Sequence, residues 1–472
     1  MGIFSRIKEL CEESHVRMID FKMVDMDGRW RHVTIPAERF DDELLSQGIG
    51  FDGSNYGYAA VEKSDMVFIP DPDSAHIDPF TETPTLSMTG KVYTIHGAEQ
   101  RLFDQYPPNV CRSAVARMQA LGIADRMRIA PEFEFHIFDH VDFALQPEDS
   151  HLQIATCQAG WPAGGNASYR TDKGGGYHIT SPQDVNFELR NQICLLLADW
   201  GIDVKYHHHE VGGSGQLEIE VELGDMPDMA DRTMIIKYVV KNAAAMAGKT
   251  ATFMPKPIAG EAGNGMHVHM LLMKGDQPLF YDANGYSGLS REAHWFIGGL
   301  LAHASSLAAF TNPSTNSFKR LIPGFEAPVT LGYATSNRSA VIRIPAYARK
   351  PESKRFELRC PDATCNPYYA YAAILMAGLD GIEKQIDPAE RGWGPYDFNL
   401  YDLPEEEQKK IKSLPRSLDE ALDALEADHD YLTADGVFPE RLIQLWINRK
   451  RREAARVQQV PTPAEFAAYF NL

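Results

Sequence analysis

The sequence predicts an α+β protein with a small N-terminal β-domain and a larger domain in which strands alternate with helices. Two observations carry this prediction. The chain of 472 residues is longer than one typical hydrophobic core requires. Residues 16–95 form short apolar alternating runs, whereas long helical patterns begin at about residue 109. We therefore expect two domains, 1–105 and 106–472.

The N-terminal region is punctuated by turn sequences. It opens with SRIKELCEESHV, an amphipathic helical pattern without the apolar segment of a signal peptide. Its strand-like runs are then separated by DG, DGSN and PDPDS. Two consecutive prolines, Pro107 and Pro108, end the region, and a helix is predicted over 109–123.

The C-terminal region alternates between the two kinds of pattern, which is typical of an α/β arrangement. The predicted strands are 129–138, 206–212, 215–223, 265–273 and 339–347, and the predicted helices include 232–249 and 366–385.

Composition excludes several classes of protein. The formal net charge of −19 argues against nucleic-acid and anionic-membrane partners, because both require a basic face. Six scattered cysteines without a CxxC pair make a zinc ribbon or a disulfide scaffold unexpected. The most apolar stretch, 295–310, contains a histidine and two serines and falls short of a membrane span. We expect a soluble, cytoplasmic protein.

Four glutamates form two pairs. Strand alternation places Glu132 and Glu134 on one face, about 6.5–7 Å apart. If a GGSG turn centred on Ser214 joins two hairpin arms, Glu210 and Glu218 lie directly opposite each other, with Cβ atoms about 4.5–5.5 Å apart. Like charges in that position are destabilising, and a bound cation would convert the repulsion into binding.

His267 and Glu357, on other strand-like segments, extend this set. Oxygen-rich ligation with an occasional imidazole favours Mg²⁺ or Mn²⁺ over zinc. The alternative is that the glutamates of LEIEVE mark only the solvated face of a half-buried strand. In YHHHE, alternation directs His207 and His209 away from Glu210, whereas His208 shares its face.

Arginines are concentrated in the C-terminal half of the chain. Guanidinium groups bind carboxylate and phosphate through two points, which indicates an anionic substrate and a transferring phosphoryl group. The alternative for Arg355, Glu357 and Arg359, which share one strand face, is an exposed salt-bridge ladder. The arginines are Arg320, Arg338, Arg343, Arg355 and Arg359.

Together these segments resemble bacterial-type (type I) glutamine synthetases over essentially the full chain. The resemblance is carried by FDGSN, SDMVFIPD, PEFEF, KGGGY, HHHEVGGSGQLE, KTATFMPKP, GMHVH, NPSTNSFKRLIPGFEAP, NRSAVIRIP, RFELRCPD and NPYYAYAAILMAGLDGI. It implies an N-terminal β-grasp domain and a large α/β catalytic domain of the glutamine synthetase/guanido kinase-like fold. It also implies a dodecamer of two stacked hexameric rings, with active sites between neighbouring subunits.

The resemblance also implies roles for individual residues and two or more Mg²⁺ or Mn²⁺ ions per subunit. The implied ligands are Glu134, Glu210 and Glu218 for the first ion and Glu132, His267 and Glu357 for the second. Glutamate would contact Gly263, Arg320, Glu326 and Arg359. ATP and its phosphates would contact His208, His269, Arg338, Arg343 and Arg355. Asp52 of a neighbouring subunit, Glu326 as a flap and Arg338 would take part in catalysis.

The implied reaction joins ammonium to the γ-carboxylate of glutamate through γ-glutamyl phosphate, with ATP as the phosphoryl donor. Three departures from the family pattern bear on the substrate and the nucleotide: Ala262 replaces an asparagine, Leu271 replaces a serine, and KGGGY has an extra glycine. The alternatives are a γ-glutamyl ligase for an organic amine, a catalytically silent structural member and a metal-dependent hydrolase. Tyr401 is either an adenylylation site or an unmodified loop tyrosine.

Overall fold

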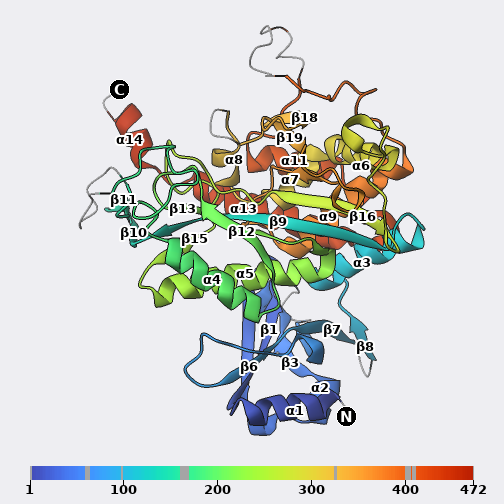
Figure 1. The fold of residues 1–472 in the computed structure, drawn as a ribbon. Coiled ribbons are helices and arrows are strands. Elements are labelled where there is room, and N and C mark those ends of the chain that lie inside the picture. The colour runs from blue at the N-terminus through green and yellow to red at the C-terminus, as the bar shows by residue number, and fades with distance from the viewer. Residues whose placement is uncertain are drawn as a thin grey trace.

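The computed structural model of the chain describes residues 3–58, 64–96, 99–159, 169–323, 327–398, 406 and 411–470. A small N-terminal β-region, blue in Figure 1, adjoins a larger region in which helices pack around a long sheet. The predicted α+β class is therefore confirmed.

The N-terminal region contains two four-stranded sheets. The first has the order β2-β1-β6-β5 and the second β3-β4-β7-β8. The strands are β1 (Met18–Val24), β2 (Trp30–Pro36), β3 (Ile49–Asp52), β4 (Asp65–Pro70), β5 (His76–Ile77), β6 (Thr85–Met88), β7 (Gly90–His96) and β8 (Glu99–Leu102). The helices are α1 (Ile3–Glu13) and α2 (Asp42–Gln47).

The larger region is organised around β9 (Arg126–Phe138), the longest strand described, which pairs with β13, β14, β15 and β16. The main path of its ten-stranded sheet is β12-β13-β9-β16-β20-β19-β18. Its other strands are β12 (Val204–His209), β13 (Gln216–Val221), β14 (Gly224–Asp225), β15 (Thr250–Thr252), β16 (Val268–Lys274), β17 (Gln277–Pro278), β18 (Thr330–Thr335), β19 (Ala340–Ile344) and β20 (Phe356–Leu358). A separate hairpin consists of β10 (His140–Leu145) and β11 (Ser150–Ala155).

Helices surround this sheet. They are α3 (Pro107–Ala120), α4 (Phe187–Asp199), α5 (Met226–Met246), α6 (Arg291–Ala302), α7 (Ala304–Thr311), α8 (Ser317–Arg320), α9 (Pro367–Glu383), α11 (Leu418–Ala427), α12 (Asp430–Thr433), α13 (Glu440–Gln458) and α14 (Pro463–Tyr469). The two prolines expected to end the N-terminal region begin α3, where a missing N–H costs no helical hydrogen bond. Among the described residues, no helix is long and apolar enough to cross a membrane.

Helix α9 joins the two regions. Its apolar residues lie on all sides, and nearly all of them are buried, which is typical of a helix in the middle of a core. Asn366 caps it by accepting the Tyr368 N–H at 3.2 Å. The Asn366 side-chain amide also donates to the carbonyl oxygens of Asp25 and Met26, in the turn between β1 and β2. The helix cap therefore also anchors the N-terminal region.

The hairpin of β12 and β13 has a different register from the predicted one. His208, not Glu210, lies opposite Glu218, and the Glu210 N–H donates to the Gln216 carbonyl oxygen at 2.9 Å. The expected direct opposition of Glu210 and Glu218 is therefore wrong. The turn is shifted by one residue because the Gln216 side chain closes it, with its Oε1 accepting the Gly212 N–H at 2.8 Å.

Candidate active site

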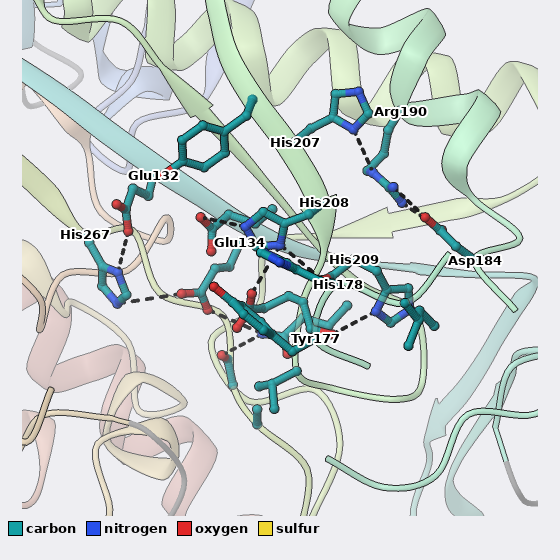
Figure 2. Close-up of a pocket in the computed structure, with 18 of the residues that line it drawn as sticks. Glu132, Glu134, Tyr177, His178, Asp184, Arg190, His207, His208, His209 and His267 are labelled. Carbon is teal, nitrogen blue, oxygen red and sulfur yellow. Dashed lines mark hydrogen bonds and ion pairs between the residues drawn. The ribbon is translucent and has the colours of Figure 1, made fainter. Parts of the chain in front are cut away.

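A cavity of about 660 Å³ is lined by side chains of β9, β12, β13, β19 and β20 and of adjoining loops (Figure 2). It brings together residues that are far apart in the sequence. The predicted site residues that line it are Glu132, Glu134, His208, Glu210, Glu218, Gly263, His267, Arg320, Arg338, Arg343, Glu357 and Arg359.

One carboxylate cluster forms where β12, β13 and β9 lie side by side. Glu218 on β13 is directly opposite Glu134 on β9. His208 lies between Glu210 and Glu218, with its ring nitrogens 3.5 Å from a carboxylate oxygen of each. One ligand atom from each of these three residues lies within 4.8 Å of the others, which is close enough to hold one ion. We call His208, Glu210 and Glu218 the first cluster.

In the first cluster, the charged forms of both glutamates are disfavoured. Burial, together with the Glu134 and Glu218 carboxylates, raises the pKa of Glu210 to about 9. Burial and the charges of Glu132 and Glu134 raise the pKa of Glu218 well above its usual range. The cluster is therefore stable with a bound proton or a bound cation, and a divalent ion would stabilise both charged carboxylates at once.

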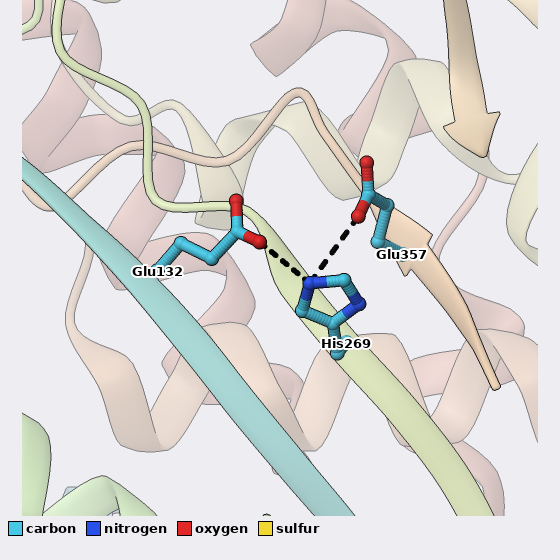
Figure 3. A group of neighbouring side chains, drawn as sticks. All are labelled: Glu132, His269 and Glu357. Carbon is cyan, nitrogen blue, oxygen red and sulfur yellow. Dashed lines mark hydrogen bonds and ion pairs between the residues drawn. The ribbon is translucent and has the colours of Figure 1, made fainter. Parts of the chain in front are cut away.

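A second cluster consists of Glu132, His269 and Glu357 (Figure 3). His269 Nε2 lies 2.6 Å from Glu132 Oε1 and 3.2 Å from Glu357 Oε2. Although burial disfavours an imidazolium, the two carboxylates raise the pKa of His269. Burial acts to raise the pKa of Glu132, but His269 and His267 outweigh it and hold that pKa well below its usual range.

The two histidines of GMHVH have different surroundings. His269, which the resemblance places near phosphate, is fully buried and belongs to the second cluster. His267, which the resemblance gives as a ligand beside Glu132 and Glu357, lines the cavity between the two clusters. Its Nδ1 is 2.7 Å from Glu132, and its Nε2 is 3.6 Å from Glu134 (Figure 2).

Backbone and amide groups hold Glu134 in position. The Gly265 N–H donates to Glu134 Oε2 at 2.8 Å, and the Gln216 side-chain amide donates to the same oxygen at 3.3 Å. Gln216 also donates to the Gly263 carbonyl oxygen at 2.9 Å. A Cβ at Gly263 would lie 2.3 Å from the Pro255 carbonyl oxygen, so only glycine fits this wall of the cavity.

The arginines surround the clusters. Arg343 and Arg359 both contact Glu357 Oε1, at 3.0 and 3.1 Å, so part of their charge is already balanced. Arg320 is buried and donates to the Cys360 and Arg359 carbonyl oxygens. Arg338, in contrast, is exposed at the cavity wall.

Arg355, which the resemblance places near the phosphates of ATP, is not among the residues that line the cavity. It donates to the Ser353 carbonyl oxygen, and its guanidinium carbon lies 5.8 Å from the centre of the Tyr347 ring. Arg343 lies 5.9 Å from the same ring. Tyr347, which lines the cavity, thus connects two of the predicted phosphate-binding arginines.

Several lining residues carry no signal in the sequence. Asp184 and Arg190 form a buried two-point ion pair at 2.9 and 2.6 Å, and Arg190 Nε donates to His207 at 3.1 Å (Figure 2). The imidazole of His178 lies 4.5 Å from that of His208. Neither Asp184 nor His178 belongs to an alternating pattern that could reveal it, because both lie in loops between β11 and β12.

Three predicted residues lie elsewhere or outside the described part of the chain. Asp52 is exposed at the end of β3 in the N-terminal region, where it accepts hydrogen bonds from Ser54 and Asn55. Glu326 and Tyr401 are outside the described residues. Of the departures from the family pattern, Ala262 lines the cavity, whereas Leu271 is fully buried.

The donor set fits divalent cations that prefer oxygen ligands. Within the described residues, Glu210 Oε2, Glu357 Oε2 and His269 Nδ1 are buried without a hydrogen-bond partner. Buried polar groups without partners are costly, and a coordinated ion would satisfy carboxylate oxygens of this kind.

Comparison with known proteins identifies the family to which this arrangement belongs. A family profile described as "Glutamine synthetase, catalytic domain" matches residues 104–469, and one described as "Glutamine synthetase, beta-Grasp domain" matches residues 15–95. The chain belongs to the glutamine synthetase family. It is accordingly an enzyme, an ATP-dependent ligase, with an N-terminal β-grasp domain and a large catalytic domain.

Individual members of the family match almost the whole length of the chain. A glutamine synthetase from Frankia alni is 43% identical over 467 residues, which cover 98% of this chain and 97% of the relative. A 3-hydroxylaminophenol mutase from Cupriavidus pinatubonensis is 43% identical over 472 residues, covering 99% and 98%. The structure of Plasmodium falciparum glutamine synthetase superposes with a TM-score of 0.87 at 27% identity, covering 99% of both chains.

Proposed function

We propose that the chain is a glutamate–ammonia ligase, which forms glutamine, ADP and phosphate from glutamate, ammonium and ATP. The observation that carries this proposal is that one cavity joins two carboxylate clusters to Arg320, Arg338, Arg343 and Arg359. Carboxylates arranged for divalent cations and arginines for anionic oxygens are the two groups that phosphoryl transfer to a carboxylate requires.

The proposed ligand assignment follows the family pattern, with Mg²⁺ or Mn²⁺ as the ions. Bound ions would neutralise charge on the phosphates of ATP. The proposed ligands are Glu134, Glu210 and Glu218 for one ion and Glu132, His267 and Glu357 for the other. Because His269 already occupies the second cluster, it is a further ligand candidate for the second ion.

The proposed reaction has two steps. An oxygen of the γ-carboxylate of glutamate, held by Arg320 and Arg359, forms a bond to the terminal phosphorus of ATP, and ADP leaves. Arg338, exposed at the cavity wall, and Arg343 stabilise the charge on the transferring group. Ammonium then loses a proton to a carboxylate, its nitrogen attacks the acyl carbon, and phosphate leaves. Glu326 would close the site against water, because an acyl phosphate is readily hydrolysed.

Assembly forms part of the same proposal. Asp52 does not line the cavity of its own chain, and it is exposed. It is therefore available to the cavity of a neighbouring subunit, where it would bind and deprotonate ammonium. We propose a cytoplasmic dodecamer of two hexameric rings, with a domain boundary near residue 105. Native mass spectrometry measures the assembly, and intact mass of protein from its native host tests whether Tyr401 carries AMP.

A second candidate function is favoured by Ala262. This side chain lines the cavity at the position where an asparagine is expected, and its smaller volume leaves room for an amine larger than ammonium. The 3-hydroxylaminophenol mutase, a relative that is 43% identical to this chain, is named for a different reaction. We therefore regard a γ-glutamyl ligase for an organic amine as the alternative.

One assay separates these functions. Phosphate release from ATP and Mg²⁺ is measured with glutamate and either ammonium or a panel of amines, and the amide product is identified by mass spectrometry. Turnover with ammonium supports the proposal, and turnover only with an amine supports the alternative. Conversion of 3-hydroxylaminophenol without ATP would support mutase activity. No turnover with any acceptor would contradict all three. Omission of glutamate is the control for hydrolysis of ATP alone.

A further inference from the structure

A second cavity, of about 730 Å³, lies apart from the catalytic one and shares none of its lining residues. Its walls come from the turn Asp27–Trp30, from α5, and from the segment Phe253–Pro255. It therefore lies where the N-terminal region meets the catalytic domain.

Three cations line this cavity without a carboxylate partner in the described part of the chain: Arg29, Lys237 and Lys241. Lys237 Nζ donates to the Ala363 carbonyl oxygen at 2.7 Å, and Lys241 Nζ lies 6.0 Å from the centre of the Phe253 ring. Burial, with a contribution from Lys241, lowers the pKa of Lys237 to about 8, so these cations destabilise one another.

The carboxylates that line the cavity are already paired. Lys450 lies 3.5 Å from Asp27 and 2.9 Å from Glu453, and Arg449 donates to Asp27. Neither carboxylate forms an ion pair with Arg29, Lys237 or Lys241. Such a concentration of positive charge is unexpected in a chain with a formal net charge of −19, unless it faces an anion.

Aromatic rings form the remaining walls. The rings of Trp30 and Tyr238 are in contact, with centroids 5.3 Å apart, and Phe253 lies beneath Lys241. Rings beside cations provide flat apolar surface next to charged donors, which is typical of sites for small organic anions.

We propose that this cavity binds a small polyanionic metabolite that carries phosphate or carboxylate groups, with its oxygens on Arg29, Lys237 and Lys241. Guanidinium and ammonium groups form their strongest hydrogen bonds with such oxygens. The ligand joins two segments, because Arg29 belongs to the N-terminal region and both lysines belong to α5.

The site is coupled to the catalytic cavity through the backbone of residues 254 and 255. The Pro255 carbonyl oxygen accepts the Asn264 N–H at 2.7 Å, and the Met254 carbonyl oxygen accepts the Asn264 side-chain amide at 2.8 Å. Asn264 adjoins Gly263 in the catalytic wall. A ligand that packs against Met254 and Pro255 would therefore contact the segment that holds Asn264 beside the catalytic wall.

The test uses the full chain and two metal-free probes, inorganic pyrophosphate and tricarballylate, in isothermal titration calorimetry. The first represents phosphate groups and the second carboxylates. The variant carries Arg29→Gln and Lys241→Gln. The matched control carries Lys8→Gln and Arg456→Gln, which remove one exposed lysine and one exposed arginine elsewhere. Pyrophosphate will also bind the catalytic arginines, so two classes of site are expected in the wild type.

We expect at least one probe to bind the proposed cavity in the wild type. The Kd of that probe for the cavity should rise roughly ten-fold or more in the variant and stay unchanged in the control. Loss of the pyrophosphate class alone identifies a phosphate ligand, and loss of the tricarballylate class alone identifies a carboxylate ligand. Identical titrations of variant and wild type with both probes would overturn the proposal. So would a change of assembly in native mass spectrometry without any loss of probe binding, because the cations would then serve a neighbouring copy.

Discussion

Glu134 and Glu218 lie directly opposite each other on the neighbouring strands β9 and β13. Like charges in this position repel, and burial strengthens the repulsion because little water is present to screen it. Glu210, just beyond the end of β12, adds a third carboxylate. The fold therefore brings three mutually repelling carboxylates together. Several measurable properties depend on whether a proton or a cation compensates this repulsion.

Replacing Glu218 should separate stability from activity. In Glu218→Gln, the repulsion from Glu134 is removed, so we expect a higher melting temperature in EDTA and little further stabilisation by Mg²⁺. Activity should fall roughly hundred-fold or more, since even groups that only support metal ligands affect activity 10–100-fold. Scanning fluorimetry with and without Mg²⁺ measures the first effect. Glu222→Gln, at an exposed position near the end of the same strand, is the control, and an equal Mg²⁺ response in both variants would refute the assignment.

Metal binding should release protons. Because the pKa of Glu210 is raised to about 9, its carboxyl group holds a proton at pH 7 in the metal-free protein. A divalent ion displaces this proton, so affinity should increase as the pH rises toward 9. Titration calorimetry in two buffers with different ionisation enthalpies counts the protons. We expect fewer protons to be released when the ion binds Glu210→Gln than when it binds the wild type. Identical binding heats in both buffers for the wild type would contradict the prediction.

Gly265→Ala should impair the site without unfolding the protein. A Cβ at this position would lie 2.4 Å from Arg320 Nη2 and 3.1 Å from His267 Nε2. The arginine must therefore move, and we expect kcat/KM to fall roughly ten-fold or more. The melting temperature should change little, because the clash is with the ends of side chains. An unchanged kcat/KM would show that the position of Arg320 is not critical.

His303 should make stability dependent on pH. It contacts Asp380 and Asp428, each at 2.9 Å. Burial acts to lower its pKa, but these two carboxylates raise it above 6.5. Its contribution is therefore fully present below about pH 6.5 and is lost as pH rises through the folded-state pKa.

The corresponding measurement is urea unfolding of the wild type and His303→Gln between pH 5.5 and 8.5. We expect the difference in unfolding free energy between them to be largest at the acidic end. His140→Gln, at an exposed position, serves as the control. A difference that grows with pH would reverse the sign and refute the assignment.

Much of the fold and of the site could be predicted from alternation and spacing. The face shared by Glu132 and Glu134 follows from the two-residue period of a strand, and the helices 232–249 and 366–385 correspond to α5 and α9. The order of strands could not be predicted, because a period assigns a residue to a face but not to a neighbour. The opposition of Glu134 and Glu218 is a result of that order.

Side chains that close loops also escaped prediction. Gln216 sets the register of β12 and β13 through one hydrogen bond to Gly212, and no residue pattern reveals that bond. Similarly, the ion pair of Asp184 with Arg190 depends on the path of a loop. His267 lines the cavity whereas His269 is fully buried in the second cluster, and spacing alone does not predict this difference in side-chain direction.

Strand β9 is hydrogen-bonded to β13 on one side and to β16 on the other, so it cannot stretch or slide. Glu132, which belongs to the second cluster, and Glu134, which lies opposite Glu218 of the first, are two residues apart along it. The backbone spacing between these two glutamates is therefore one strand repeat of about 6.5–7 Å. Glu210, in contrast, lies past the end of its strand. β9 therefore fixes the spacing of two of the proposed metal ligands, and an ion of another radius would have to be accommodated by groups outside this strand.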